Sequence, residues 1–264
     1  MSREVEDFKA KKENLKLKKA NCLNIFGVRI EVSDRKSAIE KIKCAFSGDG
    51  ARAVFTPNPQ MLLLAEKDES FRQALIDADL LLPDGIGVCI AAKLLGTPLP
   101  ERITGIDTAE ELLEYASENA LSVFLLGAKS GIAEKAAEKI SLKYPRLSIC
   151  GVHHGYFEKS GVENEAVIEA INQSGAQILF VCFGAPLQER WIIENKERLD
   201  SVKLYMGLGG ALDVWSGKIK RAPLFFQKAG LEWLWRILKE PRRITVVFQI
   251  PLFLYKVVRH KYLK

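Results

Sequence analysis

Short apolar runs alternate along the chain with segments of helical periodicity. Phe71 to Ala78 and Ala109 to Ala116 each repeat apolar residues at i, i+3, i+4 and i+7, which predicts two helices with one buried face apiece. The runs expected to form strands are 51–55, 79–82, 122–127, 147–152, 178–184 and 203–209. These runs are continuously apolar, as expected where helices cover both faces of a parallel sheet. We therefore predict a Rossmann-like, mostly parallel α/β core over residues 22–216.

The second predicted helix carries capping signals at its start. Asp107 with Glu110, and Thr108 with Glu111, both have the spacing of a capping box. We expect this helix to begin at that point.

The loops after the predicted strands carry residue types that suit phosphate groups. In a parallel α/β fold, ligands lie beyond the carboxyl ends of the strands, where loops lead into helix N-termini. Glycines there let backbone amides approach an anion, and the helix ends add partial positive charge. Tight turns also explain the glycines, but the convergence of several loops favours a nucleotide site. The loop residues singled out are Gly127, Lys129, Gly184, Gln188, Gly209 and Asp213.

Asp84 follows the apolar run 79–82, between Pro83 and Gly85. Aspartate is a good N-cap, so one interpretation is that it caps a helix beginning near Ile86. A carboxylate at a strand end inside a cleft is equally suited to act as a general base toward a substrate hydroxyl. The pattern alone leaves both interpretations open.

Thr56 and Asn58 also have two interpretations. They form a turn before Pro59, which suits the first turn of a helix. Alternatively, their side chains line the same pocket as the aspartate that follows the next strand.

Metal-ligand patterns are absent from the sequence. Its three histidines lack the HExxH spacing, and its five scattered cysteines form no CxxC pair. Asp77-Ala78-Asp79 resembles a DxD motif, but Asp77 ends a predicted helix and Asp79 begins a strand. We expect no metal and no cofactor, and cysteines that are buried in a reducing compartment.

Positive charge is concentrated near the C-terminus. The formal net charge of the chain is +6, yet residues 217–264 alone carry 12 Lys and Arg against two Glu, together with eight aromatic residues. Such a mixture suits an anionic membrane surface. No recognisable nucleic-acid module accompanies it, so a nucleic-acid partner is not expected.

The distribution of charged and apolar residues suggests a division of the chain into three parts. Residues 1–21 are charged and lack the apolar core of a secretory signal, and no segment reaches the roughly 20 apolar residues that span a bilayer. We expect a solvated N-terminal arm over 1–21, the core over 22–216, and a helical, membrane-docking C-terminal appendage over 217–264. The protein is expected to be cytoplasmic and peripheral on the inner face of the cell membrane.

Several blocks of sequence carry a family resemblance. They are TPNPQ at 56–60, ADLLLPDGIGV at 78–88, RITGID at 102–107, FGAPLQE at 183–189 and GGALDVWSGKIKRAP at 209–223. Blocks of these sequences in this order resemble the WecG/TagA/CpsF glycosyltransferases, and the resemblance covers nearly all of the chain after Cys22. The segment GLEWLWRILKEPRR at 230–243 is most similar to the TagA branch, the N-acetylmannosaminyltransferases of wall teichoic acid synthesis.

This resemblance implies an activity and a fold. Members of the family like TagA move N-acetylmannosamine with inversion from UDP to the 4-hydroxyl of N-acetylglucosamine carried on undecaprenyl diphosphate. The fold implied is a Rossmann-like core termed GT-E, with a C-terminal appendage that docks on the membrane and closes the active site. The implied partners are the UDP-sugar donor, the lipid-linked acceptor and an anionic membrane.

The resemblance also implies roles for particular residues. Asp84 is the implied base, and Thr56 and Asn58 are implied pocket residues. We expect Thr56 to take part in catalysis, and Asn58 and Gly85 to bind substrate. Arg102, Gln188 and Asp213 are implied substrate contacts.

The appendage supplies the remaining predicted site residues. Arg236 and Arg243 are our candidates for stabilising charge on the leaving diphosphate, although Glu232 has the spacing to hold Arg236 in a surface pair instead. Membrane or lipid-diphosphate contact is expected from Arg221, Trp233, Trp235 and Arg242. Leu231, Leu234, Trp235 and Leu238 repeat at helical spacing, which is equally typical of packing on the core.

Two other functions stay open at this point. One is an enzyme of the same family with another donor, such as N-acetylmannosaminuronic acid or glucose. The other is a non-catalytic, nucleotide-binding protein of the membrane surface. The sequence leaves homo-oligomerisation open as well.

Overall fold

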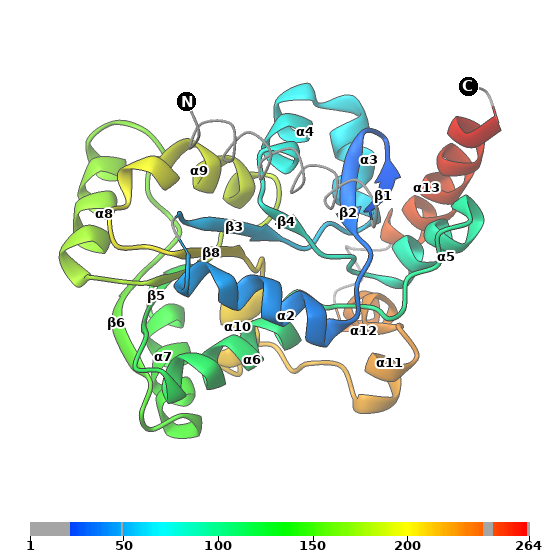
Figure 1. Ribbon diagram of the computed structural model, residues 1–264. Coiled ribbons are helices and arrows are strands. Elements are labelled where there is room, and N and C mark those ends of the chain that lie inside the picture. The colour runs from blue at the N-terminus through cyan, green and yellow to red at the C-terminus, as the bar shows by residue number, and fades with distance from the viewer. Residues whose placement is uncertain (1–21, 49, 240–244, 263–264) are drawn as a thin grey trace, which may run out of the picture.

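Six parallel strands form the central sheet of the protein (Figure 1). The computed structural model describes residues 22–48, 50–239 and 245–262, so the arm predicted over 1–21 lies outside the described residues. The strand order is β4-β3-β8-β7-β5-β6, and every neighbouring pair is parallel. The predicted α/β class with a parallel sheet is confirmed.

The strands match the six apolar runs, with ends shifted by up to two residues. They are β3 (Arg52–Phe55), β4 (Leu80–Leu81), β5 (Ser122–Gly127), β6 (Ser148–His153), β7 (Ile178–Cys182) and β8 (Leu204–Gly207). All residues of β7 and β8 are buried, because these strands lie in the middle of the sheet with helices on both sides. The edge strand β6 is only partly buried. The loops after β7 and β8 therefore leave the sheet at its centre.

Helices cover both faces of the sheet (Figure 1). On one face α2, α6, α7 and α10 enclose one apolar core, and on the other α3, α4, α8 and α9 enclose a second. Their bounds are α2 (Arg35–Lys43), α3 (Pro59–Lys67), α4 (Glu69–Ile76), α5 (Ile86–Leu95), α6 (Gly105–Glu118), α7 (Ile132–Lys143), α8 (Gly161–Ser174), α9 (Leu187–Asn195) and α10 (Ala211–Trp215), with short 3-10 helices at Cys44–Phe46 and Lys196–Arg198.

An antiparallel hairpin precedes the sheet and was not predicted from the sequence. It consists of β1 (Cys22–Ile25) and β2 (Val28–Glu31). Its two-residue turn has positive φ at Phe26 (53°) and Gly27 (86°), the backbone that suits a tight hairpin. The hairpin adds apolar side chains to the core formed with α3 and α4.

The start of α6 differs from the prediction. The helix begins at Gly105, and its N-cap is Thr104, whose hydroxyl accepts a hydrogen bond from the backbone N–H of Asp107 at 3.3 Å. The capping boxes expected at Asp107 and Thr108, three and four residues after Thr104, are therefore wrong. Asp107 instead lies inside the helix, where its carboxylate is used for other contacts.

The described residues of the C-terminal segment form α11 (Leu224–Lys228), α12 (Glu232–Lys239) and α13 (Thr245–Tyr262). α13 packs against α3 and α5, and its Phe253 and Val257 are buried in the core. The expected apolar stripe of α12 is found only in part, since Leu238 is exposed and Ile237 is the buried residue. The domain division at residue 216 stays a prediction.

Among the described residues, no helix combines the length and apolar character needed to cross a membrane.

Candidate functional site

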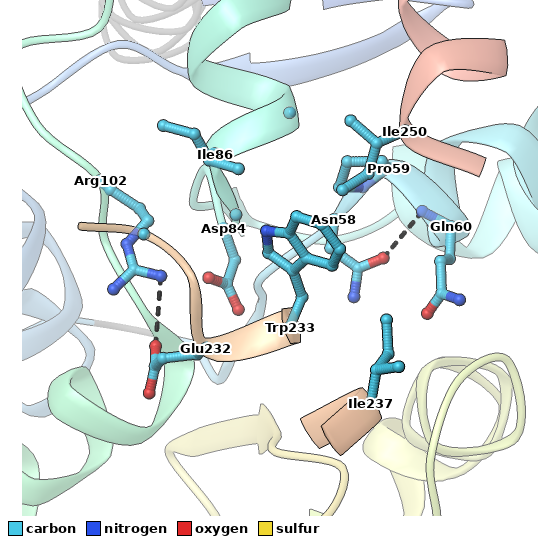
Figure 2. Close-up of a pocket in the computed structure, with 13 residues that line it drawn as sticks. Asn58, Pro59, Gln60, Asp84, Ile86, Arg102, Glu232, Trp233, Ile237 and Ile250 are labelled. Atoms are coloured by element: carbon cyan, nitrogen blue, oxygen red, sulfur yellow. Dashed lines mark hydrogen bonds and ion pairs between the residues drawn. The ribbon is translucent and has the colours of Figure 1, made fainter. Parts of the chain in front are cut away.

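Three adjoining cavities lie along the carboxyl edge of the sheet. The first, which we call the tail cavity, lies between the loops after β3 and β4 and the helices of the appendage. Figure 2 shows its walls, which include Asn58, Asp84, Arg102, Trp233 and Ile237. Ile250 of α13 also lines it. The cavity therefore joins polar residues of the core to apolar residues of the C-terminal helices.

The second cavity, the central cavity, lies over the ends of β3 and β8. Thr56, Thr104, Gln188, Glu189 and Gly209 are among the residues that line it. It shares Asn58, Asp84 and Glu232 with the tail cavity. The carboxylate of Asp84 thus stands at the junction of the two.

The third cavity, the distal cavity, lies over the ends of β5, β7 and β8. It is lined by Lys129, Gly184, Asp213 and Lys218, and it shares Gly209 and Gly210 with the central cavity. Its volume of about 770 Å³ lies within the range of about 300 to 1,000 Å³ that is usual for ligand pockets. Predicted residues from three loops are therefore brought together here.

The turn at Asp84 aims its side chain at the cavities. Gly85, rather than Asp84, stands at the N-cap position of α5, with φ of 88°. The interpretation of Asp84 as an N-cap is therefore wrong. Its backbone N–H donates to the carbonyl of Pro57 at 3.3 Å, which ties the turn to the loop after β3. Figure 2 shows its carboxylate extending from the start of α5 toward α12.

Asn58 combines a structural contact with a place in the site. Its Oδ1 accepts hydrogen bonds from the backbone N–H groups of Gln60 (2.9 Å) and Met61 (3.1 Å), which caps α3. Pro59 occupies the first helical position. Because Oδ1 is occupied, Asn58 presents its NH2 group as the donor toward the cavity (Figure 2).

A chain of ion pairs links the appendage to the core. Glu232 of α12 pairs with Arg102 at 3.1 Å and with Arg221 at 3.4 Å, and Arg221 also pairs with Asp107 at 2.6 Å. Burial acts to raise the pKa of Asp107, but the Thr104 hydroxyl and the Arg221 guanidinium outweigh it and hold that pKa below its ordinary value.

These pairs bear on two predicted roles. Arg102 lines the tail cavity, with its guanidinium between Glu232 and the carbonyl of Gln227, to which it donates at 3.0 Å. Arg221 lies in the same ion-pair chain, a position that favours attachment of the appendage over contact with lipid. Substrate contact for Arg102 and lipid contact for Arg221 stay predictions.

Gln188 and Glu189 place two polar side chains in the interior. The exposed fractions are 4% for Gln188 and 0% for Glu189. Gln188 Oε1 accepts from the backbone N–H of Gly184 (3.2 Å) and Gly209 (2.9 Å), and its Nε2 donates to Glu189 Oε1 (2.7 Å). Burial raises the pKa of Glu189 to about 7, against the opposing effect of the Gln188 hydrogen bond.

Other predicted residues have contacts of different kinds. Gly127 has φ of 142°, and a Cβ there would lie 2.5 Å from the carbonyl oxygen of Cys182, so this glycine permits close strand packing. Asp213 pairs with Lys218 at 2.7 Å. Trp235 packs on Phe226, with ring centroids 5.5 Å apart. Ligand or lipid contact by these residues stays a prediction.

Several predicted arginines cannot be placed. Arg242 and Arg243 lie outside the described residues, as does the side chain of Arg236. Their roles at the diphosphate and the membrane stay predictions.

Two carboxylates of the site were missed as site residues by sequence reasoning. Glu189 lies within FGAPLQE in the first turn of α9, between Gln188 and Arg190, so no local pattern distinguishes it from an exposed helical glutamate. Local spacing predicts Glu232 only as a partner for Arg236, because its pairing with the distant Arg102 depends on the tertiary fold. Both residues line the central cavity.

The DxD-like segment has a structural explanation. Asp79 Oδ2 accepts a hydrogen bond from the backbone N–H of Ala53 at 2.9 Å, and Asp77 ends α4 while accepting one from Gln73 at 2.8 Å. Within the described part of the chain, no three His, Cys, Asp or Glu side chains form a group that could hold a metal ion. The expectation of a metal-free protein stays a prediction.

Comparison with known proteins shows the family to which this chain belongs. The model of the glycosyl transferase WecG/TagA/CpsF family matches residues 23–264, and the chain belongs to that family. It is 34% identical over 241 residues to N-acetylglucosaminyldiphosphoundecaprenol N-acetyl-beta-D-mannosaminyltransferase of Staphylococcus aureus strain MRSA252, covering 90% of this chain and 93% of that protein. The same-named proteins of strains MW2 and NCTC 8325 are equally similar. The resemblance seen in the motifs is confirmed.

The raised pKa of Glu189 predicts a pH-dependent effect of Glu189→Gln on stability. Because the unfolded chain loses this proton at lower pH than the folded protein, the stability associated with the protonated form is present in acid and lost as pH rises through about 7. Glutamine mimics the protonated form at every pH. Calorimetry should therefore give a variant-minus-wild-type difference in melting temperature that grows by roughly 5 °C from pH 5 to pH 8.

Glu194→Gln, at an exposed position of the same helix, is the matched control and should shift the melting temperature equally at both pH values. A Glu189→Gln difference that does not change with pH would contradict the assignment.

Proposed function

We propose that this protein transfers N-acetylmannosamine from UDP to the 4-hydroxyl of N-acetylglucosamine on undecaprenyl diphosphate, with inversion, forming the β-1,4-linked disaccharide lipid of wall teichoic acid linkage-unit synthesis. The names of its relatives in Staphylococcus aureus support the sugar and the lipid-linked acceptor. The donor nucleotide and the linkage come from the family resemblance of the motifs.

The observation that carries this proposal is the order of the three cavities. The distal cavity adjoins the central cavity at Gly209 and Gly210, and the central cavity adjoins the tail cavity at Asn58, Asp84 and Glu232. We assign the nucleotide to the distal cavity, the transferred sugar to the central cavity and the acceptor to the tail cavity. In this arrangement Asp84 stands where the two sugars meet.

The transfer is a single displacement at the anomeric carbon. Asp84 takes the proton of the acceptor 4-hydroxyl, and that oxygen forms the new bond to the anomeric carbon of the donor sugar. The bond from this carbon to the diphosphate oxygen breaks, and UDP leaves with the electron pair. Attack opposite to the leaving group accounts for inversion.

Negative charge that develops on the leaving diphosphate needs stabilisation. Lys129 and Lys218 line the distal cavity and are suited to this task. Arg236 and Arg243 of the appendage stay candidates, with positions outside the described side chains. We propose that these cations, rather than a metal ion, balance the charge.

The appendage is proposed to contact the membrane that holds the acceptor lipid. Half of the exposed large apolar side chains in the described part of the chain lie between residues 224 and 262, among them Leu224, Phe225, Leu238 and Phe248. Apolar side chains interspersed with basic ones bind anionic interfaces through both burial and charge. A peripheral position on the inner leaflet would bring the tail cavity to the lipid-linked substrate.

The activity is tested by UDP release with a panel of UDP-sugars and a short-chain polyprenyl diphosphate N-acetylglucosamine acceptor. UDP-N-acetylmannosamine should give the highest kcat/KM, and Asp84→Asn should lower turnover by about 10²- to 10⁴-fold with an unchanged melting temperature, because it removes the base. Asp77→Asn, at the exposed end of α4, is the control. Preference for another donor would redirect the substrate, and full activity of Asp84→Asn would remove the base assignment.

Chelation by EDTA should leave turnover within about twofold, because a base and protein cations are proposed to supply the charge balance. The measurement is the rate of UDP release before and after addition of EDTA. A loss of turnover that Mg²⁺ or Mn²⁺ restores would contradict metal-independent transfer.

Phe225→Ser should weaken binding to vesicles that contain anionic phosphatidylglycerol, since Phe225 of α11 is 75% exposed. The measurement is cosedimentation of the full-length protein with these vesicles. Leu142→Ser changes a side chain that is 82% exposed on α7 and should have no effect. Equal binding by wild type and both variants would place the membrane contact elsewhere.

A further inference from the structure

The first turn of α9 buries a carboxyl group that the proposed mechanism does not use. Glu189 is fully buried, yet it lines the central cavity together with Thr56, Thr104 and Asp84. Buried carboxylates are rare unless their oxygens are paired. The contacts of each oxygen of Glu189 therefore bear on what the cavity holds.

One oxygen of Glu189 has a structural task. Oε1 accepts the hydrogen bond from Gln188 Nε2 at 2.7 Å. That bond fixes the Gln188 amide so that its oxygen faces the backbone N–H groups of Gly184 and Gly209, which join the loops after β7 and β8. Glu189 thus helps to hold the wall between the central and distal cavities.

The other oxygen has no such task. Oε2 is buried and has no hydrogen-bond partner among the described residues. Leaving a buried acceptor unpaired costs free energy. A molecule in the central cavity that donates an O–H or N–H group to Oε2 would remove this cost.

The charged residues that line the central cavity limit the chemical class of that molecule. Besides Glu189, its lining includes the carboxyl groups of Asp84 and Glu232, and no Lys, Arg or His is present among the described lining residues. Because no cation accompanies them in the described lining, these carboxyl groups disfavour a phosphate. They suit a neutral molecule that is rich in hydrogen-bond donors, which is the chemistry of a sugar ring.

We propose that Glu189 is a recognition residue for the transferred sugar, whose hydroxyl or amide N–H donates a hydrogen bond to Oε2. This inference rests on the proposed function and adds a specificity-determining residue to it. Glu189 binds the sugar part of the donor and leaves the nucleotide part to the distal cavity.

Glu189→Gln tests this inference because it separates the two oxygens. Glutamine keeps an oxygen for Gln188 Nε2 but places an NH2 group where Oε2 accepts, so a hydrogen-bond acceptor becomes a donor. The probes are UDP and UDP-N-acetylmannosamine, with binding to the full-length protein measured by calorimetry at pH 8. Glu194→Gln serves as the matched control.

We expect the Kd of UDP to change by less than about twofold and the Kd of UDP-N-acetylmannosamine to rise by about tenfold or more, as for the loss of a hydrogen bond to a charged group. The kcat/KM for the donor should fall by at least the same factor. The inference would be overturned if Glu189→Gln left the Kd of UDP-N-acetylmannosamine as unchanged as the Kd of UDP.

Two further outcomes are distinguishable. Equal weakening of UDP and UDP-sugar in Glu189→Gln would assign Glu189 to the cavity wall alone and overturn the inference while leaving the proposed function standing. Failure of the wild-type protein to bind either probe would overturn the proposed function, and this inference with it.

Discussion

The close approach of two helix starts holds the site together. A Cβ on Gly87 of α5 would lie 2.6 Å from the Pro59 ring of α3, so only glycine lets the two first turns meet. Asn58 immediately precedes α3, and Asp84 lies two residues before α5. Packing of these turns therefore sets the separation of Asn58 and Asp84 across the cavities. α13 contacts both helices, with Ile250 close to Gly87, so the appendage depends on the same contact.

A chain of ion pairs also positions the appendage on the core. Carboxylates and guanidinium groups alternate from Asp107 through Arg221 and Glu232 to Arg102, which links α6 to α12. These side chains are largely withdrawn from solvent, and loss of one partner leaves another charge uncompensated in a half-buried place. The chain of pairs therefore favours one position of α12 relative to the core. Trp233 and Ile237 line the tail cavity from that position.

The sequence predicted the parts of the fold that local periodicity determines. The six apolar runs became the six strands, because central strands such as β7 must be apolar on both faces. The hairpin at residues 22–31 was missed, since its turn is Phe26-Gly27 rather than a common turn pair. The start of α6 was misplaced because Asp107 and Glu110 have the spacing of a capping box, whereas the residue that caps the helix is Thr104.

The candidate site was predictable to a similar extent. Asp84, Thr56 and Gln188 lie at strand ends, where topology brings loops together, and they do line one cavity. Glu189 and Glu232 were not predicted as site residues, because their places depend on burial and on contacts between distant segments. Family resemblance supplied roles for motif residues, but it gave no account of which oxygen of a carboxylate is paired.

The distribution of charge around the cavities fits two substrates that each carry a diphosphate and a neutral sugar. The described lining of the central cavity has carboxyl groups and no cation, whereas Lys129 and Lys218 line the distal cavity and Arg102 lines the tail cavity. Both flanking cavities hold carboxylates as well, among them Asp213 and Glu232, but of the three cavities only these two also hold a cation among the described lining residues. A donor with its diphosphate in the distal cavity and an acceptor with its diphosphate toward the appendage would place both sugars between the cations. The reacting hydroxyl and the anomeric carbon then meet beside Asp84, which accepts the proton, and the local negative charge favours the approach of a carbon that becomes positive as its bond to UDP breaks.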